Sequence, residues 1–291
     1  PLIFELNNPD DWDNVDLLEQ SNPLKPYLPN ITPYLKQRVA LAKKKGGTVE
    51  TNVKVKNCGI WVWSSEVWVS HDKLKTNRKR LDYDGIKNLS CYCAFDFSKG
   101  GDLCAFGAYF PEVNAYRVWF WLPEERYRDD SDGVDYTLWE DYITIQPGIV
   151  FDLDSVVDDA MKYMEEYHIA GIGADKWNFN NGPSQRLAKV YGFDDQVSIH
   201  GGALTPAINE IESMLTAGEL ELFDNPVLWW NFSNCLKVVE STDRVKIMKA
   251  DYKTTKKKKI DGAICLILAK EIYNRMSMEP EKPDFNYVIL E

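Results

Sequence analysis

Three closely spaced apolar runs, followed by alternating helices and strands, limit how this chain can fold. The runs cover Cys91–Phe97, Leu103–Phe110 and Tyr116–Leu122, and short turns between such runs are typical of an antiparallel meander. Apolar residues at helical spacing then predict a helix over 154–167, and a strand is expected at Ile169–Ala174. The expected order is three strands, a helix, a strand, a helix, a strand and a terminal helix.

This order predicts the α/β RNase H-like fold. A crossover helix makes the fourth strand parallel to the meander strand that it joins. The result is a mixed central sheet, an antiparallel meander extended by parallel strands, flanked by helices. Residues 89–291 are assigned to this domain. Residues 1–88 are punctuated by prolines and are predicted to form an irregular N-terminal extension.

Three aspartates stand at the ends of the expected elements. Asp96 ends the first strand, Asp175 ends the strand at Ile169–Ala174, and Asp261 opens the apolar helix Gly262–Ala269. If the two strands are neighbours, both carboxylates reach the sheet edge where open α/β folds place their sites. Converging acids repel one another, so we expect two hard divalent cations there, Mg²⁺ or Mn²⁺.

Each aspartate also has a purely structural interpretation. Asp261 could simply cap its helix, and Asp96 and Asp175 could accept hydrogen bonds from loop amides. Their occurrence together at compatible positions favours the metal site. Three further polar residues are candidate accessory ligands or water-orienting groups: Asp102, Asp251 and His200.

A lysine run directly precedes Asp261 and suits a polyanionic substrate. Lysine contacts to phosphates position a nucleic-acid backbone without reading its sequence. A solvated surface is the usual interpretation of such a run, but its position beside an acidic site favours substrate binding. The predicted DNA contacts are Lys253, Lys256, Lys257, Lys258 and Lys259, and Lys246 and Lys249 could extend the track.

The composition narrows the class of protein. A formal net charge of −11 argues against nucleic-acid binding by the overall field, although a local basic track is compatible with it. The six cysteines lie mostly in apolar runs, and Cys91-Tyr-Cys93 has no second cysteine pair or histidine cluster to complete a zinc site. This favours buried thiols in a reducing, intracellular setting. No stretch approaches the ~20 apolar residues of a membrane span. The first residue is Pro1, so we expect a piece of a longer protein.

Several segments resemble the large terminase subunit of tailed bacteriophages. The likeness is carried by Ala94–Ser98, by residues 173–178 and above all by Lys259–Ala269. Segments 146–148 and 225–234 agree as well. The resemblance covers nearly the whole chain, and the Lys-Ile-Asp-Gly segment at 259–262 is its most specific part.

The resemblance implies a genome-packaging motor with an N-terminal ATPase and a C-terminal nuclease. The metal-binding acids of the family would fall on Asp96, Asp175 and Asp261, acting as an endonuclease on double-stranded concatemeric viral DNA in the host cell cytoplasm. Expected partners are DNA and, in the full-length protein, the portal and the small terminase subunit. No G-x-x-x-x-G-K-[ST] loop occurs, so ATP hydrolysis is not expected, and residues 1–88 would be a linker from the ATPase domain.

Two other hypotheses remain open at this point. The acidic net charge and the tryptophan-rich first third also suit a non-cleaving docking module that binds DNA, portal or small terminase subunit. The same fold could instead serve a resolvase or integrase-like enzyme, which the lack of a strongly basic composition disfavours. Replacing any of the three aspartates by asparagine separates a nuclease from a docking module.

Overall fold

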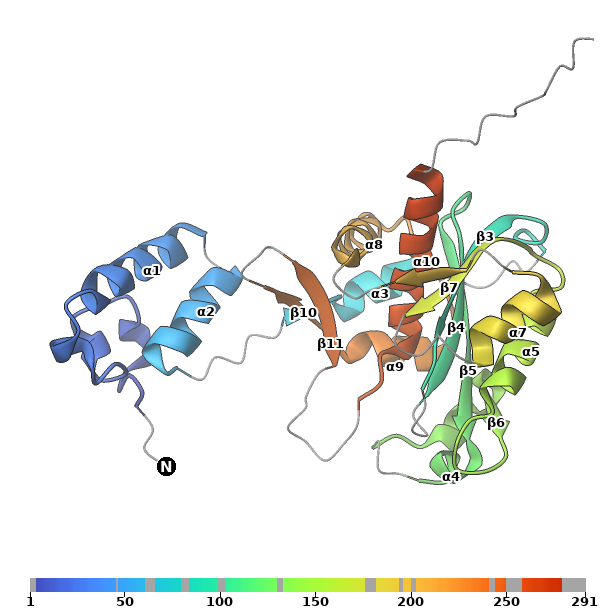
Figure 1. Cartoon of the computed structure of the whole chain (residues 1–291), viewed down its shortest axis with the longest axis horizontal. Helices are drawn as coiled ribbons and strands as arrows, with labels where there is room; N and C mark the ends of the chain where they lie inside the picture. The colour runs from blue at the N-terminus through green and yellow to red at the C-terminus, as the bar shows by residue number, and fades with distance from the viewer. Residues whose placement is uncertain are drawn as a thin grey trace, which may run out of the picture. The chain divides into compact units, whose positions relative to one another are not determined.

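The chain is organised in two compact units. A computed structural model describes residues 4–45, 47–60, 66–79, 84–98, 103–129, 133–175, 182–193, 196–199, 203–240, 244–249 and 258–278. One unit comprises Pro1–Glu66 with Val238–Arg244, and the other comprises Val67–Lys237 with Val245–Glu291. Figure 1 shows the elements of each unit.

The first unit is a small helical body. It contains three single-turn 3-10 helices, η1 (Pro9–Asp11), η2 (Leu17–Glu19) and η3 (Lys25–Tyr27), followed by α1 (Ile31–Lys45) and α2 (Gly47–Cys58). In the sequence, Thr32-Pro33 has the cap-then-proline form that predicts a helix start, with the helix running to about Lys45 before Gly46-Gly47, and α1 confirms it. Helix α2 has no such signal. Leu35, Val39 and Ala42 of α1 share a buried apolar cluster with α2.

The second unit is built on an eight-stranded sheet. Its strand order is β2-β9-β5-β4-β3-β7-β8, and β6 pairs with β5. The strands are β2 (Arg78–Lys79), β3 (Ser90–Asp96), β4 (Cys104–Phe110), β5 (Ala115–Pro123), β6 (Ile143–Gln146), β7 (His168–Asp175), β8 (Val197–Ile199) and β9 (Glu221–Phe223).

The topology is RNase H-like, as predicted. Strands β3, β4 and β5 form the antiparallel meander. After the crossover through α5, β7 joins the first meander strand, β3, in parallel, and β8 joins β7 in parallel. Strand β9 adds a parallel pairing with β5 on the other side of the meander.

Helices cover both faces of this sheet. They are α3 (His71–Asn77), α4 (Glu124–Tyr127), the 3-10 helix η4 (Tyr136–Tyr142), α5 (Leu153–Tyr163), α7 (Gly182–Tyr191), α8 (Thr205–Ala217), α9 (Pro226–Ser233) and α10 (Asp261–Met278). Figure 1 shows α10 on one face and α5 with α7 on the other. A second sheet has the order β1-β10-β11, with β1 (Glu66–Val67), β10 (Cys235–Val239) and β11 (Val245–Lys249).

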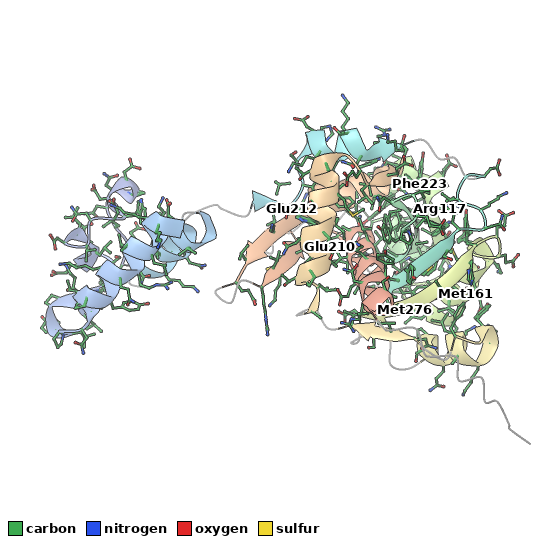
Figure 2. All side chains as sticks on the ribbon, turned by 90° about the horizontal axis from the view of Figure 1, so that it is seen from above. Arg117, Met161, Glu210, Glu212, Phe223 and Met276 are labelled. Atoms are coloured by element: carbon green, nitrogen blue, oxygen red, sulfur yellow. The ribbon has the colours of Figure 1, made fainter. Side chains whose placement is uncertain are left out.

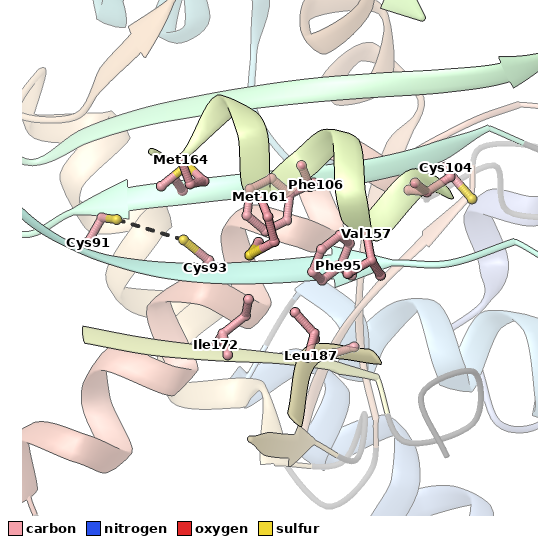
Figure 3. Close-up of a cluster of buried hydrophobic side chains, with 14 of the residues drawn as sticks. Cys91, Cys93, Phe95, Cys104, Phe106, Val157, Met161, Met164, Ile172 and Leu187 are labelled. Carbon is pink, nitrogen blue, oxygen red and sulfur yellow. Dashed lines mark hydrogen bonds between the residues drawn. The ribbon is translucent and has the colours of Figure 1, made fainter. Parts of the chain in front are cut away.

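Alternation along the central strands assigns each side chain to one face. Cys91, Cys93 and Phe95 of β3 belong to the apolar cluster with α5 and α7 (Figure 3). Successive side chains of a strand point to opposite faces, so the residues between them face α10. Tyr92 confirms this, because its ring meets that of Tyr273 on α10 edge to face, with centroids 5.1 Å apart.

Helix α10 is buried along most of its length, as its apolar sequence predicts. Two charged residues within it, Lys270 and Glu271, are nevertheless buried. The Lys270 Nζ lies 2.8 Å from Glu210 of α8, and the Asn274 amide donates to the same carboxylate at 3.1 Å. Figure 2 labels Glu210 on α8, beside α10. These contacts attach α8 to α10 where apolar packing alone was expected.

Helix α5 is shorter than the expected 154–167. It ends at Tyr163 because the Met164 N–H bonds to the carbonyls of Lys162 and Met161, which closes the last turn. All six cysteines are buried and free, in agreement with the thiols predicted from their apolar surroundings. Within the described ranges, no helix combines the length and the apolar character that a membrane crossing requires.

The close approach of β8 to β7 depends on Gly173. A Cβ atom at this position would overlap the Val197 carbonyl and lie 3.1 Å from Ile272 of α10. We therefore expect Gly173→Ala to reduce the free energy of unfolding by about 1–3 kcal/mol, the usual cost of overpacking. Gly182→Ala is the control, because among the described residues its new methyl would meet just the tip of Asp154, at 3.2 Å. Denaturant unfolding of both variants checks this, and equal effects would contradict it.

Candidate active site

Two of the three predicted aspartates lie at neighbouring strand ends. In the parallel ladder of β3 and β7, Phe95 is opposite Ala174. The next residues along the two strands, Asp96 and Asp175, therefore end the two strands at the same level. Ala174 belongs to the cluster on the α5 face, so alternation directs both carboxylates to the α10 face.

The third aspartate is the first residue of α10, on that same face. The carbonyl of Ile260 accepts the N–H groups of Ala263 and Ile264, which starts the helix at Asp261. One turn later, the thiol of Cys265 interacts with the backbone of Asp96. The beginning of α10 therefore lies against the end of β3, which is the arrangement expected from the sequence.

The electrostatics show that Asp96 is close to the other two acids. Its pKa is raised well above the ordinary value, first by burial and then by the charge of Asp261, with a further contribution from Asp175. Lys249 of β11 opposes this shift. Asp96 is thus the carboxyl on which the repulsion of both neighbours acts.

Asp261 is buried, with 6% of its surface exposed. Burial raises its pKa, while Lys249, the backbone N–H groups at the helix start and Lys259 oppose the shift. Its buried Oδ2 atom has no hydrogen-bond partner among the described residues. A buried carboxylate oxygen without a donor is costly, and this oxygen is the type of ligand that a hard cation takes.

The three acids are neighbours but do not form a finished cage. Within the described parts of the chain, no group of three or more His, Cys, Asp or Glu side chains is arranged to hold a metal ion as it stands. Their chemistry fits a divalent cation, because carboxylate oxygens suit Mg²⁺ and Mn²⁺. A cation between Asp96 and Asp261 would also relieve the repulsion recorded in the raised pKa of Asp96.

The predicted lysine track is only partly described. Lys258 is half-buried and lies within reach of solvent. Lys259 differs from the expected exposed contact, because only 1% of its surface is accessible and burial lowers its pKa. Its ammonium group interacts with Asp261 instead. The other predicted positions lie outside the described residues: Asp102, His200, Asp251, Lys253, Lys256 and Lys257.

Polar residues that were not predicted surround the start of α10. Tyr116 of β5 and two asparagines of the α9 region, Asn231 and Asn234, hydrogen-bond to its backbone. A sequence signal for one of them exists, because Asn231 interrupts the apolar run Val227–Phe232 and a buried polar residue needs a partner. Nothing in the sequence identified that partner.

Comparison with known proteins identifies the family of the chain. A sequence model of the family described as terminase large subunit, endonuclease domain, matches residues 25–276. The chain belongs to this family and is a terminase nuclease domain.

Individual relatives are distant. Protein YmfN of Escherichia coli (strain K12) is 21% identical over 289 residues, covering 92% of this chain and 61% of that protein. The crystal structure of the HK97 bacteriophage large terminase superposes with a TM-score of 0.63 at 17% identity, covering 93% of this chain and 55% of that one. The large terminase nuclease of thermophilic phage G20c with bound magnesium gives a TM-score of 0.48 at 11% identity, covering 72% and 98%. The chain thus spans under two thirds of the length of the first two.

The raised pKa values of two of the acids predict an unusual pH dependence of stability in chelator. The raised pKa values of Asp96 and Asp261 mean that the folded state holds protons that the unfolded state releases above about pH 4. Stability therefore falls as pH rises from there through the raised values. Asp96→Asn removes one such charge, so its melting temperature should exceed that of the parent by a margin that grows with pH.

Thermal melts in chelator between pH 4 and pH 8 measure this margin as the melting temperature of the variant minus that of the parent. Asp159→Asn is the matched control, since Asp159 forms a surface ion pair with Lys162 on α5. Its difference from the parent is the reference against which the margin of Asp96→Asn is compared. A margin for Asp96→Asn that shrinks with rising pH would contradict the assignment.

Proposed function

We propose that this chain is a divalent-metal-dependent endonuclease that cuts double-stranded, concatemeric viral DNA during genome packaging. The observation that most strongly supports this proposal is the β3–β7 register. Phe95 lies opposite Ala174, which supports a site made by Asp96 and Asp175 on the α10 face. The electrostatic effect of Asp261 on Asp96 supports its inclusion. Membership of the terminase endonuclease-domain family supports the reaction type.

In this proposal Asp96, Asp175 and Asp261 hold two Mg²⁺ or Mn²⁺ ions. The bound cations would supply Lewis acidity, which generates a nucleophile from water and stabilises charge on the leaving oxygen. Asp96, which feels both other acids, is the candidate for the shared ligand. Burial raises the pKa of Asp261, and the helix start, Lys249 and Lys259 oppose this rise, which would favour the ionised form that binds a cation.

The DNA backbone would be held by lysines close to the acids. Lys246 and Lys249 of β11 are exposed, and Lys249 acts electrostatically on both Asp96 and Asp261. Lys258 would add a third contact. Such contacts neutralise phosphates regardless of base sequence. They suit a nuclease with little sequence preference.

The whole-protein context is also part of the proposal. The first two relatives extend well beyond the matched region, so docking to the portal and to the small terminase subunit is assigned to the full-length protein. We expect no ATP hydrolysis by these 291 residues, because no phosphate-binding loop of the G-x-x-x-x-G-K-[ST] form is present.

Cleavage of supercoiled plasmid tests the nuclease. With Mn²⁺ or Mg²⁺ the parent should nick and linearise the plasmid, and chelator should stop it. Asp96→Asn, Asp175→Asn and Asp261→Asn should each lower the rate by roughly 100-fold or more, since each 1.4 kcal/mol of lost transition-state stabilisation costs about tenfold.

The control for these variants is Asp159→Asn, a surface substitution on α5 that should cleave at the parental rate. Metal titration of the parent accompanies the assay. A parent that binds neither ion and leaves the plasmid intact would refute the proposal and favour the docking module. Full cleavage by any of the three aspartate variants would remove that residue from the site.

A further inference from the structure

The start of α10 is held by three side chains from elsewhere in the second unit. The N–H of Gly262 donates to Asn231 Oδ1 at 2.7 Å, and the carbonyl of Gly262 accepts from the Tyr116 hydroxyl, also at 2.7 Å. The carbonyl of Lys259 accepts from Asn234 Nδ2 at 3.0 Å. These three bonds enclose Asp261. The backbone on both sides of it is fixed, while its Oδ2 atom receives no bond from the residues that the structure describes.

Tyr116, Asn231 and Asn234, together called the clamp, supply hydrogen bonds that the helix itself lacks at its start. The first N–H groups of an α-helix have no partner within the helix and are usually satisfied by a polar N-cap side chain. Here the preceding residue is Ile260, which has no acceptor in its side chain. Asn231 takes the place of the cap for Gly262, from 31 residues away in the chain.

The clamping residues are themselves rigidly placed. Asn231 is fully buried and its Nδ2 donates to the Val227 carbonyl at 3.0 Å, which fixes the orientation of its amide. Helix α9 is capped by Asn225, whose side chain accepts from Val227 and Leu228. On the opposite side, Tyr116 is fully buried in β5.

Packing leaves the first turn little room to move. A Cβ atom on Gly262 would lie 2.6 Å from Phe120 of β5 and 3.3 Å from Leu228 of α9. The turn that carries Asp261 is therefore in contact with both elements that supply the clamp. A shift of this turn would require these bonds to break together.

We propose that Tyr116 and Asn231, assisted by Asn234, are positioning residues that hold the Asp261 carboxylate in register with Asp96 and Asp175. This inference rests on the proposed function. The three residues contact the backbone around Asp261 and leave its carboxylate oxygens to the cation. They act through Asp261. Their loss should therefore weaken metal binding more than a control substitution that lowers the stability of the fold equally.

Two conservative substitutions test the clamp. Tyr116→Phe removes one oxygen atom and keeps the ring, and Asn231→Leu removes the amide with nearly the same shape. Their matched controls are Tyr109→Phe and Asn77→Leu. Tyr109 is a buried β4 tyrosine that bonds to Asn114, and Asn77 is a buried asparagine of α3 that bridges to Leu215 and Leu220.

The first readout is the Mn²⁺ concentration that gives half-maximal plasmid cleavage, together with Mn²⁺ affinity by titration calorimetry. Loss of a residue that orients a metal ligand typically costs 10–100-fold in affinity or activity. We expect a rise of roughly tenfold in half-saturation for Tyr116→Phe and for Asn231→Leu. The controls should stay within about twofold of the parent, even where they lower the melting temperature equally.

The second readout requires neither metal nor activity. Amide hydrogen exchange in chelator should show the Gly262 N–H protected in the parent and in Asn77→Leu, and exchanging faster in Asn231→Leu. Unchanged exchange, or faster exchange with unaltered Mn²⁺ affinity, would overturn the positioning role. So would metal affinities of Tyr116→Phe that match those of Tyr109→Phe.

Failure of the proposed function is distinguishable from failure of this inference. A parent that neither binds Mn²⁺ nor cleaves DNA would refute the nuclease, and with it any role for the clamp in metal binding. A parent that does both, while the clamp variants behave like their controls, would refute the clamp alone. Asn231→Leu could also fail to fold, in which case Tyr116→Phe decides.

Discussion

The parallel pairing of β3 with β7 is the constraint on which the site depends. Side chains alternate along a strand, so a slip of one residue in this ladder would move Asp175 to the α5 face, away from Asp96. The register is fixed by what lies on each face. Ile172 and Ala174 are committed to the apolar cluster, and Gly173, between them, leaves space for β8 and for Ile272 of α10.

The placement of the acids lowers the stability of the fold, although it suits the proposed metal chemistry. Burial disfavours the charged forms of Asp96 and Asp261, and the charge of Asp261 further disfavours that of Asp96. An isolated buried charge is expensive. The surrounding fold offsets this cost through the extensive burial of α10 and the meander. In the proposed site, a cation bound between these acids would relieve their repulsion. Sites with such perturbed acids are typical of catalysis.

Much of this could be predicted from sequence because it depends on local pattern. The meander, the crossover and the position of each aspartate at an element end follow from apolar periodicity and turn residues, and the structure has them. The start of α9 also has a local signal, since Asn225-Pro226 has the same cap-then-proline form as Thr32-Pro33. Helix α2 was missed because its polar, valine-containing sequence lacks an apolar stripe.

What could not be predicted is non-local. The hydrogen bond between Tyr116 and Gly262 joins residues 146 positions apart, and no periodic pattern in the sequence predicts such a pair. The burial of Lys259 was hidden for a similar reason. A lysine run next to an acidic site suggests exposed charge, but the last lysine turns inward where Asn234 holds its carbonyl.

The side chains that form the clamp are uncharged. Asp261 is fixed by hydroxyl and amide groups that bind the backbone on either side of it, and none of these groups carries a charge. A cationic group bonded directly to the carboxylate would fix it equally well, but would compete with a metal ion for the same oxygens. Lys249 and Lys259 act on Asp261 electrostatically and oppose the rise in its pKa that burial causes. In the proposed site, neutral groups would thus fix the position of the ligand while nearby cations favour its charged form, and among the described residues no donor occupies Oδ2.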